Sequence, residues 1–199
     1  MEKLQVKDKS FVVSITEAEI QSQVRRVATE ITRDMEGKHP LFLPVLNGSF
    51  IFAADLLREI PIACEISFIK LASYQGTQSS GEIREVIGLN TDITGRHVII
   101  VEDIIDTGLT IHFLKEYIRE RYQPRHLYTV LLIKRVRKDA SYKEAPDFCG
   151  MEFDSEDYVC GFGFDHYGLG RSLPYVFVAD QQQKDEWDRM LAKDRENDE

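Results

Sequence analysis

The chain has 199 residues and a formal net charge of −9, since 34 acidic side chains outnumber 25 lysines and arginines. Apolar residues make up 43% and charged residues 30%, which is typical of a soluble globular protein able to bury one sizeable core. The acidic balance argues against a protein that coats nucleic acid, because phosphate backbones need clustered cations. No apolar run is long enough to span a bilayer.

The first residues lack the apolar core of a signal peptide, so we expect a cytoplasmic protein. Three cysteines, Cys64, Cys149 and Cys160, show no metal-type spacing. An odd number of cysteines suits reduced, partly buried thiols better than a disulfide framework.

The chain begins with a predicted strand over Ser10–Ile15. Thr16 and Glu19 then form a capping-box pattern that opens a helix. This helix closes near Gly37, and its apolar face carries Ile20, Val24, Val27, Ile31 and Met35. We expect this segment to be part of the structural framework and to carry no functional residue.

A strand–turn–helix unit follows. The apolar stretch Leu41–Leu46 predicts a strand, which Pro44 places at an edge or an irregular position. Asn47, Gly48 and Ser49 form a small-residue turn before a helix over about 50–60. The turn is a candidate anion site, with a plain connection between strand and helix as the alternative.

Residues Glu65–Leu71 predict a further strand, and Glu85–Leu89 predicts the returning arm of a hairpin. The polar stretch Ser73–Gly81 between them indicates a mobile loop. Its length fits a functional loop better than a simple connector, although a plain hairpin tip remains the alternative.

The stretch Val98–Thr110 organises the chain. Val98–Val101 is an unbroken apolar run, typical of a strand buried on both faces of a parallel sheet. Glu102 and Asp103 follow the strand, and the turn Asp106–Thr110 leads into a helix. The helix pattern consists of Ile111, Leu114, Ile118 and Tyr122.

A turn from a strand to a helix presents free backbone N–H groups and the positive end of the helix dipole, which suit a phosphate. The carboxylates of Glu102 and Asp103 would repel a bare phosphate. The combination therefore predicts a ligand that also carries hydroxyls or a divalent metal, and a sugar phosphate meets both conditions. An ordinary turn with solvated acids is the alternative.

The remaining elements are two predicted strands over Leu127–Ile133 and Asp157–Asp165 and a last strand over Tyr175–Ala179. Lys134, at the carboxyl end of a parallel strand, is expected to point into the same crevice as Glu102. We interpret His166 as a surface histidine. Residues 185–199 predict a short helix and a charged tail.

The Val98–Thr110 stretch resembles the phosphoribosyl diphosphate motif of the type I phosphoribosyltransferases. From about Leu41 to Phe177 the chain resembles the hypoxanthine-guanine branch of that family. The resemblance implies an α/β fold with a mainly parallel central sheet flanked by helices and a small hood subdomain. We expect one domain over 1–199, with a core of about 38–180 and a hood built from the terminal segments.

The resemblance also implies the phosphoribosyl and pyrophosphate contacts. Residues implied to bind ribose and its 5′-phosphate are Glu102, Asp103, Asp106, Thr107, Gly108, Leu109 and Thr110. The pyrophosphate loop, with Asn47 in place of the usual lysine, is implied to contain a cis peptide at Leu46–Asn47. Pyrophosphate contacts are implied for Asn47, Gly48 and Arg171, and Mg²⁺ ligands for Glu102, Asp103 and Asp165.

For the purine, the resemblance implies a hydrogen bond from Lys134, stacking by Tyr158 and backbone recognition at Val159. Asp106 would act as the general base or as a proton relay at purine N7, and the loop with Ser73 and Tyr74 would close over the site. The alternatives are that Tyr158 is a core aromatic residue and that Arg171 belongs to a surface ion pair.

The resemblance thus implies transfer of the 5-phosphoribosyl group from phosphoribosyl diphosphate to N9 of hypoxanthine or guanine. Two alternatives stay open: the same chemistry on xanthine or a pyrimidine, and a regulator that senses phosphoribosyl diphosphate and binds nucleic acid. The expected partners are the two small-molecule substrates, with no nucleic acid or membrane, and a homodimer or homotetramer is expected.

Overall fold

The computed structural model describes residues 3–73, 83–105, 108–136, 145–154 and 157–180. The chain divides into two compact units, one formed by Met1–Glu17 with Asp157–Glu199 and the other by Ala18–Glu156. In the described residues, no helix is both long and apolar enough to cross a membrane. Whether the chain folds as a single domain stays a prediction.

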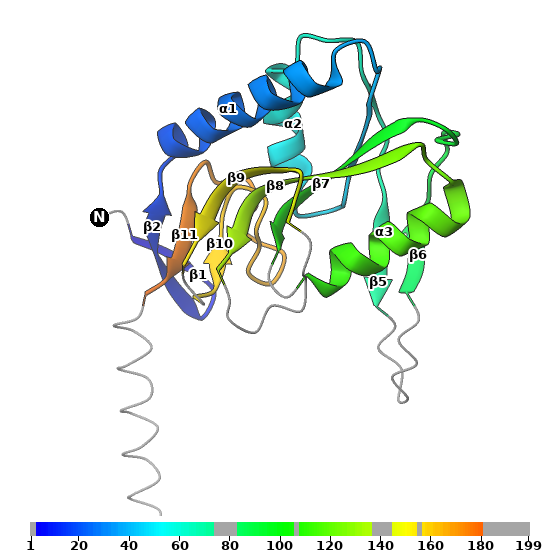
Figure 1. Cartoon of the computed structure of the whole chain (residues 1–199). Coiled ribbons are helices and arrows are strands. Elements are labelled where there is room, and N and C mark those ends of the chain that lie inside the picture. The colour runs from blue at the N-terminus through cyan, green and yellow to red at the C-terminus, as the bar shows by residue number, and fades with distance from the viewer. Residues whose placement is uncertain (1–2, 74–82, 106–107, 137–144, 155–156, 181–199) are drawn as a thin grey trace, which may run out of the picture. The chain divides into compact units, whose positions relative to one another are not determined.

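The larger unit contains a five-stranded sheet in which every pair of neighbouring strands is parallel (Figure 1). In spatial order the strands are β4 (Glu65–Ile66), β3 (Leu41–Pro44), β7 (His97–Ile105), β8 (His126–Arg135) and β9 (Phe148–Phe153). The predicted parallel sheet is therefore confirmed.

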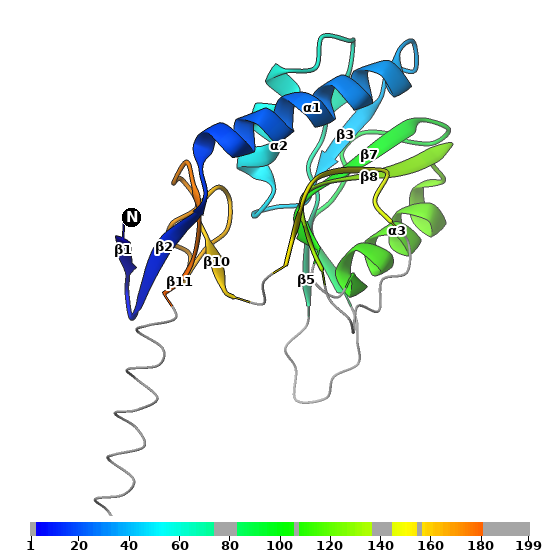
Figure 2. The same ribbon diagram turned by 60° about the vertical axis from the view of Figure 1, so that its left-hand side comes forward.

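Helices cover both faces of this sheet. Figure 2 shows α1 (Glu17–Met35) and α2 (Phe50–Arg58) on one side and α3 (Leu109–Tyr122) on the other. The apolar face predicted for α1 is confirmed, because all five of its predicted residues are buried. Gln123 takes a left-handed conformation at the end of α3, and Pro124 prevents the helix from continuing.

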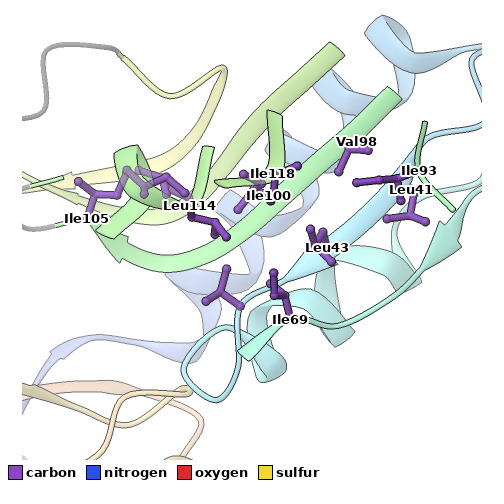
Figure 3. Packing of buried hydrophobic residues seen from close by; sticks show 12 residues of the cluster. Leu41, Leu43, Ile69, Ile93, Val98, Ile100, Ile105, Leu114 and Ile118 are labelled. Atoms are coloured by element: carbon purple, nitrogen blue, oxygen red, sulfur yellow. The ribbon is translucent and has the colours of Figure 1, made fainter. Parts of the chain in front are cut away.

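One apolar cluster joins α3 to the sheet. Figure 3 shows Leu41 and Leu43 of β3, Val98 and Ile100 of β7, and Leu114 and Ile118 of α3 in this cluster. Side chains alternate between the faces of a strand, so Phe42 and Ile99 point to the other face of the sheet, where they are also buried. Burial on both faces explains the unbroken apolar run in β7.

The prediction of one continuous strand over Glu65–Leu71 is wrong, because the segment contributes to two strands. Its first part is β4, which pairs with β3, and its last part begins β5 (Lys70–Ser73), which pairs with β6 (Ile83–Ile87) in an antiparallel hairpin. Ile69 lies between them and exchanges backbone hydrogen bonds with the end of β3, through Pro44 O (3.1 Å) and Leu46 N (2.9 Å).

The position of one strand in the sheet and the end of another also differ from the prediction. The strand containing Pro44 is internal, because β3 lies between β4 and β7. Proline is accommodated as the last residue of β3, where loss of its N–H interrupts little of the ladder. Strand β7 continues to Ile105, so the acidic pair lies within the strand and not after it.

The smaller unit is an antiparallel sheet made by both terminal parts of the chain. Its spatial order is β1 (Lys3–Val6), β2 (Lys9–Ile15), β11 (Val176–Ala179) and β10 (Val159–Cys160). Val6, Phe11, Cys160 and Phe177 form a buried cluster on this sheet. This sheet is built from the terminal segments, and its role as a hood stays a prediction.

Two predictions in this unit are wrong. The strand predicted over Asp157–Asp165 is reduced to two residues, because Gly161 and Gly163 take φ angles of +94° and +100° that bend the chain out of an extended path. His166 is not a surface residue: it is 4% exposed, and its Nε2 lies 2.8 Å from Asp8 Oδ1. The predicted terminal helix at 185–199 lies outside the described residues.

Candidate active site

The carboxyl end of β7 carries two adjacent, partly buried carboxylates, Glu102 and Asp103. Ile104 N donates a 2.8 Å hydrogen bond to Asp103 Oδ1, which fixes one oxygen of that carboxylate. Burial raises the pKa of Glu102 well above its usual range, and repulsion from the Asp103 carboxylate adds to the rise. The pair therefore favours a ligand that brings positive charge or hydroxyl donors.

A helix N-terminus follows directly. Gly108 takes a left-handed conformation (φ +81°) at the start of α3, and its carbonyl accepts the first helical hydrogen bond from His112 N at 3.0 Å. Thr110 is exposed in the first turn of the helix. Free N–H groups and the positive dipole end make this terminus suitable for an anion. Asp106 and Thr107 lie outside the described residues, as does the Leu109 side chain.

The loop between β3 and α2 packs against the acidic pair. Its Leu46–Asn47 peptide is cis, which confirms the expectation at this position. Gly48 is in such close contact with Asp103 that an added Cβ would lie 1.9 Å from Asp103 Oδ2. Ser49, fully buried, donates from Oγ to Val45 O at 2.7 Å. The turn over residues 47–49, a predicted anion site, is thus brought against Asp103 of the acidic pair.

A lysine that the sequence reasoning missed stands at this loop. Lys70 Nζ donates to Asn47 Oδ1 at 3.3 Å. The backbone bonds of Ile69 to Pro44 and Leu46 hold the start of β5 next to the loop. No local pattern marks Lys70, because the contact depends on the pairing of two segments 23 residues apart. Ser73 ends β5, and Tyr74 lies outside the described residues.

Lys134 lies near the carboxyl end of β8, opposite Ile105 of β7. Its Nζ forms a 3.0 Å ion pair with Glu152 on the neighbouring strand β9, and its side chain is 39% exposed. The side chain is thus accessible at the end of the sheet that carries the acidic pair.

In the smaller unit, three predicted site residues lie together. Arg171 forms an ion pair with Asp165 and donates from Nη1 to Gly163 O at 2.6 Å. Tyr158 donates from its hydroxyl to Asp165 O at 2.6 Å while its side chain remains 44% exposed. Burial, together with the Asp165 charge, raises the pKa of Tyr158. Val159, next to Tyr158, is buried.

The described residues contain no cluster of three or more histidine, cysteine or acidic side chains that could hold a metal by themselves. Two adjacent carboxylates nevertheless suit Mg²⁺, which is commonly bound by one or two carboxylates together with substrate phosphates and water. The donor set fits a magnesium ion that arrives with a phosphorylated substrate.

Comparison with known proteins identifies the group to which this site belongs. A family model described as a phosphoribosyl transferase domain matches residues 14–167. The chain belongs to the phosphoribosyltransferase family. The carboxylate pair, the turn into α3 and the cis-peptide loop of this phosphoribosyltransferase all fall inside the matched region.

Individual relatives show which members of the family the chain is similar to. The chain is 39% identical over 167 residues to the hypoxanthine-guanine phosphoribosyltransferase of Lactococcus lactis, covering 83% of this chain and 89% of the relative. It is 36% identical over 160 residues to the hypoxanthine-guanine-xanthine phosphoribosyltransferase of Tritrichomonas foetus, covering 80% and 86%. The hypoxanthine phosphoribosyltransferase of Trypanosoma cruzi, solved with the product IMP, superposes with a TM-score of 0.79 at 31% identity, covering 90% and 98%.

Proposed function

We propose that this phosphoribosyltransferase transfers the 5-phosphoribosyl group of phosphoribosyl diphosphate to N9 of hypoxanthine or guanine. The bond between ribose C1′ and the pyrophosphate oxygen breaks, and its electrons leave with pyrophosphate. A bond forms from purine N9 to C1′, and the purine loses one proton. The products are IMP or GMP and pyrophosphate. The single observation that carries the proposal is the meeting of the acidic pair, the α3 N-terminus and the Gly48 loop at one end of the parallel sheet.

The ribose 5-phosphate is assigned to this end of the sheet. The 5′-phosphate would bind the turn formed by Asp106, Thr107, Gly108, Leu109 and Thr110, and the free N–H groups of the α3 N-terminus support that assignment. Glu102 and Asp103 would accept hydrogen bonds from the ribose 2′- and 3′-hydroxyls, directly or through Mg²⁺. Their partial burial favours such donors over bulk water.

Magnesium would be held by Glu102, Asp103 and Asp165. When bound, it neutralises charge on the departing pyrophosphate, which is then a better leaving group than a bare polyanion. Asp165 already lies beside the Arg171 guanidinium. That guanidinium can bind phosphate in a bidentate manner, which supports its assignment to pyrophosphate.

Asn47 and Gly48 complete the pyrophosphate assignment. Asn47 lacks the charge of the lysine usual in the family, but the Lys70 ammonium stands 3.3 Å from its side-chain oxygen. We therefore add Lys70 to the site as the cation that attracts pyrophosphate to this loop. Gly48 allows the loop backbone to lie directly on Asp103.

The purine is assigned to Lys134, Tyr158 and Val159. Lys134 would donate a hydrogen bond to the oxygen on purine C6, which favours 6-oxopurines over adenine. Tyr158, with its exposed ring, would stack on the base, and the Val159 backbone would recognise the ring edge. Asp106 would accept the proton from purine N7 as general base. Ser73 and Tyr74 belong to the loop proposed to close over the reaction and exclude water.

Xanthine is the alternative base with specific support, because one relative is named for hypoxanthine, guanine and xanthine. A homodimer or homotetramer and a cytoplasmic location are part of the proposal and rest on the resemblance alone. The function is tested by incubating the protein with phosphoribosyl diphosphate, Mg²⁺ and either guanine or hypoxanthine. Equal amounts of nucleotide and pyrophosphate support the proposal, whereas hydrolysis to free ribose 5-phosphate contradicts it.

A further inference from the structure

The larger unit has an open cleft of about 770 Å³ at the amino ends of its parallel strands. Six basic side chains line it, from the segments that lead into β3, β7 and β8: Lys38, His39, Arg96, His97, Arg125 and His126. The acidic pair lies at the other end of β7. Glu102 and Asp103 stand five and six positions after His97 in β7, a span of about 17–20 Å at ~3.3 Å per residue.

The charge of this cleft is opposite to that of the chain. The cleft lining contains three permanent cations, Lys38, Arg96 and Arg125, and one carboxylate, Glu65. Glu65 is already bound in a bidentate pair with Arg96, at 2.8 and 3.0 Å. A basic cleft in a chain of net charge −9 cannot be attributed to general composition.

The histidines are held in a defined arrangement. The rings of His97 and His126 stack with their centroids 5.0 Å apart, and the Tyr128 hydroxyl lies 3.5 Å from His97 Nδ1. Burial lowers the pKa of His97, as does the positive potential from His126, Lys38 and Arg125. Protonation of His97 is thus disfavoured until an anion offsets these charges.

Two carboxylates near Tyr128 are each engaged by a neighbouring group, and neither is among the charges that shift the pKa of His97. Asp34 is paired with Arg33 at 2.8 Å, and Asp147 accepts a 2.8 Å hydrogen bond from Thr129 N. Burial raises the pKa of the Tyr128 hydroxyl, and the charges of Asp147 and Asp34 add to the rise, so Tyr128 stays neutral. Glu65 is the remaining carboxylate, and its pair with Arg96 is neutral, so Lys38 and Arg125 carry the excess positive charge of the cleft.

We propose that this cleft is a second binding site, separate from the active site, for a small anion that carries phosphate groups. Guanidinium, ammonium and imidazolium groups are the donors that recognise phosphate oxygens. The volume exceeds the need of a single phosphate and falls in the range of small-molecule sites. A diphosphate or a nucleoside phosphate therefore fits the site better than a monovalent ion.

Histidine-ring NMR tests the proposal on the intact protein. The chain has five histidines: His39, His97 and His126 in the cleft, His112 in the first turns of α3, and His166 in the smaller unit. Inorganic pyrophosphate and GTP are titrated separately without Mg²⁺, to distinguish an inorganic from a nucleotide ligand. We expect saturable shifts of the three cleft rings below about 1 mM in at least one titration, and tighter binding at pH 6 than at pH 8.

The variant K38Q/R125Q removes two cations from the cleft, and R25Q/R119Q removes two exposed arginines elsewhere as the matched control. We expect the cleft variant to weaken the cleft-ring response at least tenfold, and the control variant to leave it unchanged. His112 reports the active-site end separately, and turnover should stay within twofold in both variants. Absence of saturable cleft shifts with both ligands, or an equal response in K38Q/R125Q, would overturn the site without affecting the proposed reaction.

Discussion

The clearest test of the pyrophosphate assignment is removal of the Lys70 charge by Lys70→Gln. Two unit charges about 4 Å apart attract by about 1 kcal/mol in water and about 4 kcal/mol at an effective dielectric constant of 20. Lys70 is partly exposed, so we expect the lower part of that range, about 1–2 kcal/mol. That corresponds to a loss of pyrophosphate affinity of about 5- to 30-fold.

The assay is initial-velocity kinetics with both substrates varied and pyrophosphate added as a product inhibitor. K70Q should raise the KM for phosphoribosyl diphosphate and the inhibition constant of pyrophosphate together, while the KM for the purine changes less than twofold. The variant N47K/K70Q moves the cation to the loop itself and should restore most of the loss. R58Q, which removes a cation from the far end of α2, is the matched control. Unchanged pyrophosphate inhibition in K70Q would refute the role of Lys70.

Three further predictions follow from the site and its sheet. Gly48→Ala introduces a Cβ within 1.9 Å of Asp103 Oδ2, and should lower kcat/KM for phosphoribosyl diphosphate about a hundredfold while circular dichroism shows a folded protein. Asp106→Asn should lower kcat more than about tenfold with phosphoribosyl diphosphate binding largely kept, as measured by calorimetry; unchanged turnover would remove Asp106 from the mechanism. Because the folded-state pKa of His97 lies below its unfolded value near 6.5, the unfolded chain binds more protons as the pH falls, so stability declines below about pH 6.5. His97→Gln should therefore reduce the drop in Tm between pH 7.5 and 5.5, and an equal drop in both proteins would contradict this.

Local pattern was enough to predict the elements that form the framework. The unbroken apolar run at Val98–Val101 indicated a strand covered on both faces, and β7 lies in the interior of the sheet between β3 and β8. The spacing of Ile111, Leu114 and Ile118 indicated one apolar helix face, which packs on the sheet. These patterns are periodicities of apolar residues, which can be read from the spacing along the chain alone.

The features of the fold and site that local sequence patterns did not predict depend on pairing between distant segments. Glu65–Leu71 was interpreted as one strand, because nothing local shows that its two ends pair with different partners. The buried position of His166 depends on Asp8, 158 residues away. Likewise, the contact of Gly48 with Asp103 and that of Lys70 with Asn47 arise only when the sheet is assembled. The roles of the site residues came from the family resemblance and stay predictions.

The measurement that tests the central claim most directly is a spectrophotometric assay with five bases. Purified protein, Mg²⁺ and phosphoribosyl diphosphate are offered hypoxanthine, guanine, xanthine, adenine and uracil in separate cuvettes, each with a magnesium-free control. The account predicts nucleotide formation from hypoxanthine or guanine and none from adenine or uracil. Turnover of xanthine would be consistent with the assigned 6-oxopurine contacts and would add a third substrate. Turnover of uracil would overturn the assignment of Lys134 and Tyr158 to the base. Absence of turnover on every base, with phosphoribosyl diphosphate still bound, would contradict the enzymatic function and favour a phosphoribosyl diphosphate sensor.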